Sequence, residues 1–194
     1  MCRRKKRDRG LTPFTEDERM KKNDSAIRAE VRQRGKKVLK SQDFRRIMKQ
    51  KHHNGTVGAH SIGVAEDSMK IADALEKIGL HPDRDALVRA SLCHDLGMLD
   101  RYEKYKSNME SWTKHPDEGI RNTREHFPSV TKTEEDCIRH HMWPLSPVPP
   151  HTLEGMIVCL ADKKSACREV FRRKSTTINP EYLKEAEAGT EEKS

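Results

Sequence analysis

The chain has 194 residues, of which 33% are hydrophobic and 36% are charged, a composition typical of a polar globular domain with extensions. Its longest apolar run is Met156–Ala161, whereas a membrane-spanning helix needs about 20 apolar residues, so a membrane protein is excluded. The five cysteines are odd in number and form no CxxC pair, which excludes a disulfide framework and favours a reduced, cytoplasmic protein.

The net charge of +8 is unevenly distributed. Residues 1–51 carry 19 Lys and Arg against 7 Asp and Glu, whereas the rest of the chain is slightly acidic and holds all ten histidines. We therefore predict a disordered basic arm over residues 1–24, a folded domain over 25–173 with its core in 44–173, and a polar tail over 174–194. A nucleic-acid partner for the arm is disfavoured, because no aromatic residues alternate with its charges.

Apolar residues recur at helical spacing through the domain, and no segment alternates with a period of two. The sequence predicts helices over residues 26–34, 42–50, 56–78, 82–96, 116–127, 133–142 and 152–173. Ser25 is the expected cap of the first helix, and Gly79 ends the third. Residues 100–114 are expected to form a loop or broken helix. The predicted fold class is all-α.

Two of the last three predicted helices have start signals. Pro116 opens one of them, which places His115 at its N-terminal edge. Thr133 and Asp136 resemble a capping box for the next. The helix over 152–173 is apolar all round in its centre, as expected for a buried central helix.

Several polar residues occupy positions that this pattern buries. His60 lies on an apolar stripe, Asp95 follows the apolar residues at the end of the fourth predicted helix, and Asp162 directly follows the run Met156–Ala161. A lone buried carboxylate is costly and is usually paired, protonated or bound to a metal. Imidazole and carboxylate ligands suit iron, manganese, zinc or nickel, and the absence of cysteine here disfavours a closed structural zinc site.

The ordered set of His60, the doublet His94-Asp95 and Asp162 resembles the H…HD…D pattern of the HD-domain metal-dependent phosphohydrolases. The resemblance covers roughly residues 44–173, and HDLG at 94–97 is close to the HDxG of that family. The stretch from His141 to Leu145 and the later Leu160–Lys163 also resemble uncharacterised small bacterial HD phosphohydrolases. The resemblance implies a helical HD bundle and a bound divalent metal.

Two more matches resemble the dinuclear HD subgroup: His115-Pro116 followed by Gly119, and the pair His140-His141. The resemblance implies two divalent metals per chain, with iron or manganese favoured and zinc, nickel or cobalt as alternatives. The first metal would be held by His60, His94, Asp95 and Asp162. The second would be held by Asp95, His115 and His141. His140 stays open, because adjacent helix residues point about 100° apart. His94 and Asp95 are the expected catalytic residues.

The expected reaction is hydrolysis of a phosphomonoester or phosphodiester, of the nucleotide kind, by a hydroxide that bridges the two metals. Many dinuclear relatives carry a lysine where this chain has Met98, so Lys163 or Lys104 is a candidate for phosphate binding, and Trp143 for the pocket rim. The GYP segment of the cyclic-di-GMP phosphodiesterases is missing. The alternatives are a mononuclear phosphatase, or a non-catalytic protein whose basic arm binds nucleic acid or an acidic partner. The oligomeric state is left open.

Overall fold

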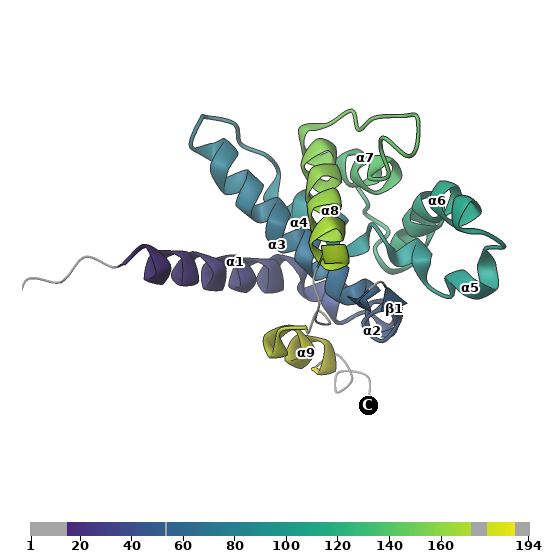
Figure 1. Ribbon diagram of the computed structural model, residues 1–194, viewed down its shortest axis with the longest axis horizontal. Coiled ribbons are helices and arrows are strands. Elements are labelled where there is room, and N and C mark those ends of the chain that lie inside the picture. The colour runs from purple at the N-terminus through teal and green to yellow at the C-terminus, as the bar shows by residue number, and fades with distance from the viewer. Residues whose placement is uncertain (1–14, 53, 172–177, 189–194) are drawn as a thin grey trace, which may run out of the picture.

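The computed structural model describes residues 15–52, 54–171 and 178–188, and within them the predicted all-α fold is confirmed (Figure 1). Only two short strands, β1 (Lys51–His52) and β2 (Gly55–Thr56), interrupt the helices in this part of the chain, and they pair antiparallel. The α-helices are α1 (Glu16–Leu39), α2 (Gln42–Ile47), α3 (Val57–Glu76), α4 (Arg84–Cys93), α5 (Arg101–Lys104), α6 (Asn108–His126), α7 (Lys132–His140), α8 (Leu153–Phe171) and α9 (Pro180–Glu187). A 3-10 turn, η1 (Leu96–Met98), follows α4.

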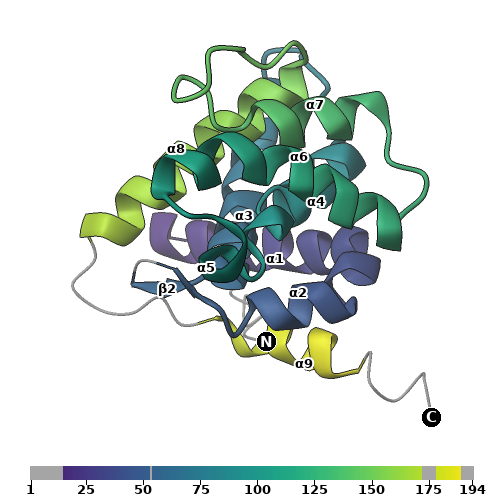
Figure 2. The ribbon, with the colours of Figure 1, turned by 90° about the vertical axis from the view of Figure 1, so that its right-hand side faces the viewer.

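The centre of the molecule is the contact of α3, α4 and α8. α7 packs against both α4 and α8, and α6 lies beside α7 (Figures 1 and 2). The side chains of Val64, Leu87 and Val158, one from each central helix, are completely buried. The prediction that the centre of α8 is buried on all sides is wrong, because Leu160, within its apolar run, is 51% exposed. Within the described ranges, every helix is too short or too polar to cross a bilayer.

The N-terminal helix is longer than predicted. α1 begins at Glu16 rather than Ala26, because Thr15 and Glu18 form a capping box in which each side chain bonds the other residue's backbone. Ile27 and Val31 lie on the buried face of this helix. Residues 16–24 of the predicted arm are therefore helical, and residues 1–14 lie outside the described part of the chain.

The segment before His115 is also more helical than predicted. α6 begins at Asn108, with the Ser107 hydroxyl accepting the Glu110 N–H, so Pro116 is inside the helix rather than at its start. His115 is consequently in mid-helix, with about two turns before it. Residues 100–114 form a broken helix, one of the two predicted alternatives, since α5 ends at Lys104 and α6 begins at Asn108. The predicted helix start at Pro116 was wrong, because it gave Pro116 more weight than the Ser107 cap.

The predicted capping box at Thr133 and Asp136 was also wrong. Thr131 and Glu134 form the box that starts α7. Asp136 instead accepts the Thr152 N–H at 2.9 Å and the Thr152 hydroxyl at 2.7 Å, just before α8 begins. Both pairs are three residues apart, but the box favours Glu or Gln as its second residue, which only the Thr131 and Glu134 pair provides.

Part of the predicted polar tail is structured. In α9 the Tyr182 side chain is completely buried, and its hydroxyl donates to Glu66 Oε1 at 2.9 Å. α9 contacts α1 (Figure 1), so residues 180–187 belong to the packed fold. The rest of the predicted tail, residues 174–177 and 189–194, lies outside the described part of the chain.

Candidate metal centre

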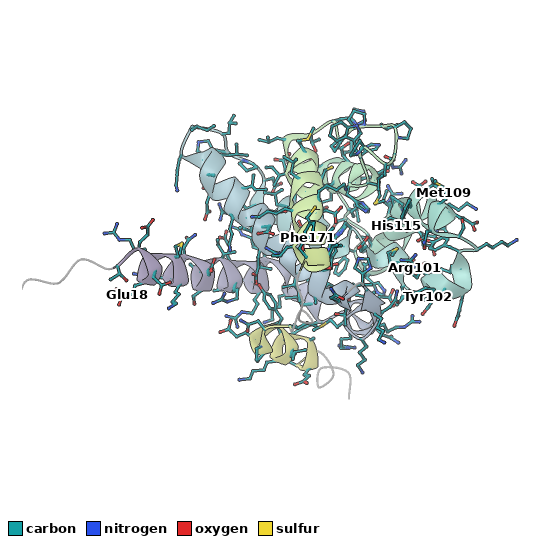
Figure 3. All side chains as sticks on the ribbon, in the orientation of Figure 1. Glu18, Arg101, Tyr102, Met109, His115 and Phe171 are labelled. Atoms are coloured by element: carbon teal, nitrogen blue, oxygen red, sulfur yellow. The ribbon has the colours of Figure 1, made fainter. Side chains whose placement is uncertain are left out.

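Six of the predicted ligands converge at one buried position, although they come from five different segments. All have exposed fractions of 8% or less. They are His60 on α3, His94 and Asp95 after α4, His115 on α6, His141 after α7 and Asp162 on α8. His115 points from α6 toward the interior of the molecule, close to α8 (Figure 3).

Two glycines bring the chain turn at Asp95 against α6. A Cβ atom on Gly97 would lie 1.9 Å from the main-chain oxygen of His115, and one on Gly119 would lie 3.1 Å from that of His94. Only a residue without a side chain fits at Gly97. The glycines of HDLG and of the His115-Pro116…Gly119 match are therefore packing residues that set Asp95 opposite His115.

The two oxygens of Asp95 face two different pairs of histidines. Oδ1 lies 3.3 Å from His115 Nε2 and 3.7 Å from His141 Nε2. Oδ2 lies 3.5 Å from His94 Nε2 and 4.0 Å from His60 Nε2. Asp162 Oδ1 completes the second pair, at 2.9 Å from His60 Nε2 and 3.8 Å from His94 Nε2. Asp95 thus stands between two groups of potential ligands.

Three of the four imidazoles are oriented by main-chain carbonyls of their own helices. Nδ1 of His94, His115 and His141 each lies 2.7 Å from a carbonyl oxygen, so Nδ1 carries the proton and donates it. This leaves Nε2, the atom that faces the cluster, with a free lone pair in the neutral ring. Such outer hydrogen bonds are typical of metal-ligating histidine.

This donor set fits a metal. His94 Nε2 is buried without a hydrogen-bond partner, and an orphaned buried polar atom is costly. His115 Nε2 and His141 Nε2 lie 3.0 Å apart, and with both Nδ1 protons in place their lone pairs face each other. A cation between such atoms would remove both costs. Four imidazoles and two carboxylates are ligands that divalent transition metals accept.

The electrostatics of the cluster keep its two carboxyl groups and the His141 ring in the metal-binding protonation states. Burial raises the pKa of Asp95, but the charges of His94 and His115 outweigh burial and hold it well below its usual range. Burial also raises the pKa of Asp162, but the hydrogen bond from His60 and the nearby charge of His94 lower it well below that range. Burial and repulsion from His94 and His115 lower the pKa of His141 to about 3, so this ring is neutral at pH 7.

His60 differs from the other three histidines because its Nδ1 contacts a carboxylate. Glu169 Oε1 lies 3.1 Å from His60 Nδ1, and Glu169 is only 4% exposed. Burial lowers the pKa of His60, but its bonds to Asp162 and Glu169 raise the net value to about 10. Glu169 was not among the predicted site residues, although it lies seven residues after Asp162 on the same helix face.

His140 does not join the cluster. Its Nδ1 donates to Asp136 Oδ1 at 2.8 Å, and the ring packs edge-on against His151. The neighbouring His141 faces Asp95 instead, because successive residues at a helix end point in different directions. Asp136, His140 and His151 form a separate group of potential ligands, but the Asp136 oxygens already accept bonds from residues 151 and 152.

A pocket of about 290 Å³ opens onto the cluster, and one of the three predicted substrate residues lines it. Lys163 lies there, with its Nζ donating to the His141 carbonyl at 2.6 Å and to Asp162 Oδ2 at 2.8 Å. Lys104 is outside the pocket and pairs with Glu118. Trp143 is not in the lining. The pocket's indole is that of Trp112, which was not predicted because residues 100–114 were expected to form a loop or broken helix.

The described fold is thus a helical domain that buries a histidine and aspartate centre suited to divalent metals at the base of an open pocket. The family model of the HD domain matches residues 57–167, more than half of the chain, and the chain belongs to this family. HD domains generally are metal-dependent phosphohydrolases. Comparison with curated proteins and with solved structures gives no match.

Proposed function

We propose that this protein is a dinuclear metal-dependent phosphohydrolase that cleaves a phosphomonoester or phosphodiester of a small molecule such as a nucleotide. The observation that carries the proposal is the placement of Asp95, whose two oxygens face separate histidine pairs. A carboxylate in that position can bind one metal through each oxygen. The membership of the HD family supports the class of reaction.

The six clustered residues divide into two ligand groups. His60, His94, Asp95 and Asp162 would hold one metal, and Asp95, His115 and His141 would hold the other. Metal ions in such a site act as Lewis acids toward phosphoryl oxygens and make water a stronger nucleophile at neutral pH. The roles of His94 and Asp95 are therefore those of ligands next to the reacting phosphate.

The protein's own residues prepare the site in three ways. The main-chain carbonyls fix the histidine tautomers, and the burial of the cluster limits its contact with water. The ammonium group of Lys163 is held beside Asp162 and partly exposed at the pocket wall, where it can bind a phosphate oxygen. Preorganised charges of this kind stabilise developing negative charge better than water does.

The deciding experiment is metal analysis of protein purified without chelator, combined with phosphate release from a panel of phosphoesters. Close to two metals per chain are expected, and activity should be lost with chelator and restored by manganese or iron. His115→Ala and His141→Ala should each lower the content toward one metal. His140→Ala is the matched control, because its side chain faces Asp136, and it should keep both.

The outcomes separate the alternatives. One metal in the unaltered protein, unaffected by His115→Ala, would indicate the mononuclear phosphatase. Metal-free protein that still hydrolyses phosphoesters would contradict the proposal altogether. Metal-loaded protein without phosphate release from any ester, under any metal, would indicate a binding protein instead.

A further inference from the structure

The wall of the pocket above the cluster is apolar, in contrast to its polar base. The apolar side chains come from separate segments: Trp112 from α6, Met98 from η1, and Met142 and Leu145 from the connection after α7. Trp112 is 40% exposed and Leu145 is 63% exposed, so both keep surface free for contact. A large apolar surface at the mouth of a polar site indicates the part of the ligand that does not react.

Trp112 lies on the same face of α6 as His115, the metal-site residue of that helix. It lies one turn before His115 and one turn after Asn108, so these three residues form a stripe that runs from the rim to the cluster. The neighbouring Ser111 donates to the sulfur of Met98 at 3.5 Å and ties α6 to η1. The indole therefore has a fixed relation to the place where phosphate would be held.

The rim also carries a positive charge. Arg101, at the start of α5, lines the pocket and donates to the amide oxygen of Asn108 at 2.7 Å (Figure 3). Its guanidinium carbon lies 5.2 Å from the centre of the Tyr102 ring. Both partners are uncharged, so the guanidinium keeps its ability to pair with an anion.

We propose that the substrate is a phosphoester whose alcohol portion carries an aromatic ring and a second anionic group, with the ring against Trp112 and the anion at Arg101. This inference rests on the proposed phosphohydrolase function. The pocket volume of about 290 Å³ lies close to the lower end of the usual range for ligand sites, which favours a small ligand. Stacking on an indole tolerates different rings, so nucleosides and benzylic alcohols share this chemistry.

The test compares esters with alcohols of similar acidity. Benzyl phosphate and cyclohexylmethyl phosphate differ in the planarity of the ring, and kcat/KM should favour benzyl phosphate in the unaltered protein. Trp112→Ala should lower that preference about tenfold, which corresponds to about 1.4 kcal/mol of stacking, whereas Trp112→Phe should keep most of it. Phe171→Ala, which removes an exposed aromatic ring outside the pocket lining, is the control and should leave the preference intact.

The anionic group is tested with 4-carboxybenzyl phosphate against benzyl phosphate. Arg101→Gln should lower the ratio of their kcat/KM values by about two- to fivefold, as expected for a partly exposed ion pair. A nucleoside 5′-monophosphate against ribose 5-phosphate then distinguishes a nucleoside from a simple benzylic ligand. Loss of the preference only in the nucleoside pair after Trp112→Ala would assign the ring to a nucleobase, and loss only in the benzyl pair would assign it to a smaller ligand.

Binding without turnover keeps this inference separate from the proposed function. In Trp143→Phe protein loaded with manganese, Trp112 is the remaining tryptophan, and benzylphosphonate should change its fluorescence while cyclohexylmethylphosphonate should not. A fluorescence change without phosphate release from any ester would overturn the proposed function but support the aromatic site. Phosphate release at equal rates from benzyl phosphate and cyclohexylmethyl phosphate would overturn the aromatic site. An unchanged preference for benzyl phosphate in Trp112→Ala would overturn it as well.

Discussion

Gly97 is the position at which a single methyl group should disturb the centre most. In Gly97→Ala the new Cβ would meet the His115 carbonyl oxygen at 1.9 Å, the Gly119 nitrogen at 2.7 Å and the His115 carbonyl carbon at 2.8 Å. All three are main-chain atoms of α6, so no side-chain rotation can relieve the clash. An ordinary contact begins near 3.4 Å, and η1 and α6 must therefore separate by about 1.5 Å.

That separation acts directly on the metal ligands. Asp95 lies two residues before Gly97, and its Oδ1 is 3.3 Å from His115 Nε2 in the unaltered protein. A displacement of the order of 1 Å in a catalytic constellation can cost about 100-fold in rate. We expect Gly97→Ala to lose metal at the His115 and His141 group, to lose about 1–3 kcal/mol of unfolding free energy from overpacking, and to lose most of its activity.

Isothermal titration with manganese and thermal unfolding would measure the two effects. The matched control is Gly63→Ala on α3, where the new Cβ meets only the side-chain atoms Ser165 Oγ at 3.0 Å and Arg168 Nη2 at 3.3 Å. These ends can move, and alanine favours a helix over glycine by up to about 1 kcal/mol, so this variant should be neutral or more stable. If Gly97→Ala bound as many metal ions per chain as Gly63→Ala and were as stable, the packing role of Gly97 would be refuted.

Three further changes test separate parts of the structure. Glu169→Gln should weaken metal binding at the His60 group by about 10- to 100-fold, because the carboxylate that orients His60 becomes a neutral amide. Thr15→Ala should cost about 1 kcal/mol of unfolding free energy, because it removes the cap of α1. Asp136→Asn should remove a pH-dependent stabilisation: burial raises the pKa of Asp136, but bonds from Thr152, His151 and His140 lower it to about 2. That stabilisation is present above the ordinary pKa of 3.8 and disappears as the pH falls toward 2.

Each of these measurements has a result that would contradict its reasoning. Unchanged chelator competition in Glu169→Gln would show that Glu169 does not affect the ligand. Urea unfolding of Thr15→Ala at the same midpoint as the unaltered protein would show that the cap contributes nothing. For Asp136→Asn, the difference in unfolding free energy from the unaltered protein should shrink between pH 5 and pH 3, and a constant difference would exclude the titration of this carboxyl.

His60, Asp95 and Asp162 could be proposed from the sequence because each occupies a position where a polar side chain has no local reason to be, whereas His94, His115 and His141 followed from the resemblance to the HD family. His60 interrupts an apolar stripe, and Asp162 ends an apolar run, so burial followed from helical periodicity alone. The convergence of these residues could not be derived in that way. It depends on the packing of α3, α4 and α8 and on the contact of Gly97 with α6, which are tertiary facts.

The missed features share one physical cause, which is that their signals are long-range or ambiguous. In the sequence, Glu169 resembles any other charged residue at a polar helix end. Only its contact with His60, 109 positions away in the chain, distinguishes it. Tyr182 reads as part of a polar tail until its burial beneath α3 residue Glu66 is known. Proline favours the first turn of a helix, and this rule placed the helix start at Pro116. The helix begins about two turns earlier, at Asn108.

The two halves of the centre differ in the charge that surrounds them. We expect this difference to set the order in which the two ligand groups bind metal ions. The His60 and His94 half contains Asp95 Oδ2 and Asp162, with Glu169 behind His60, whereas the His115 and His141 half shares only Asp95 Oδ1. A divalent cation is held more strongly where more anionic oxygens are close. Manganese titration should therefore show a tight first equivalent and a weaker second one. His115→Ala should abolish the weaker step and leave the tight step, and two equal steps in the unaltered protein would contradict this charge argument.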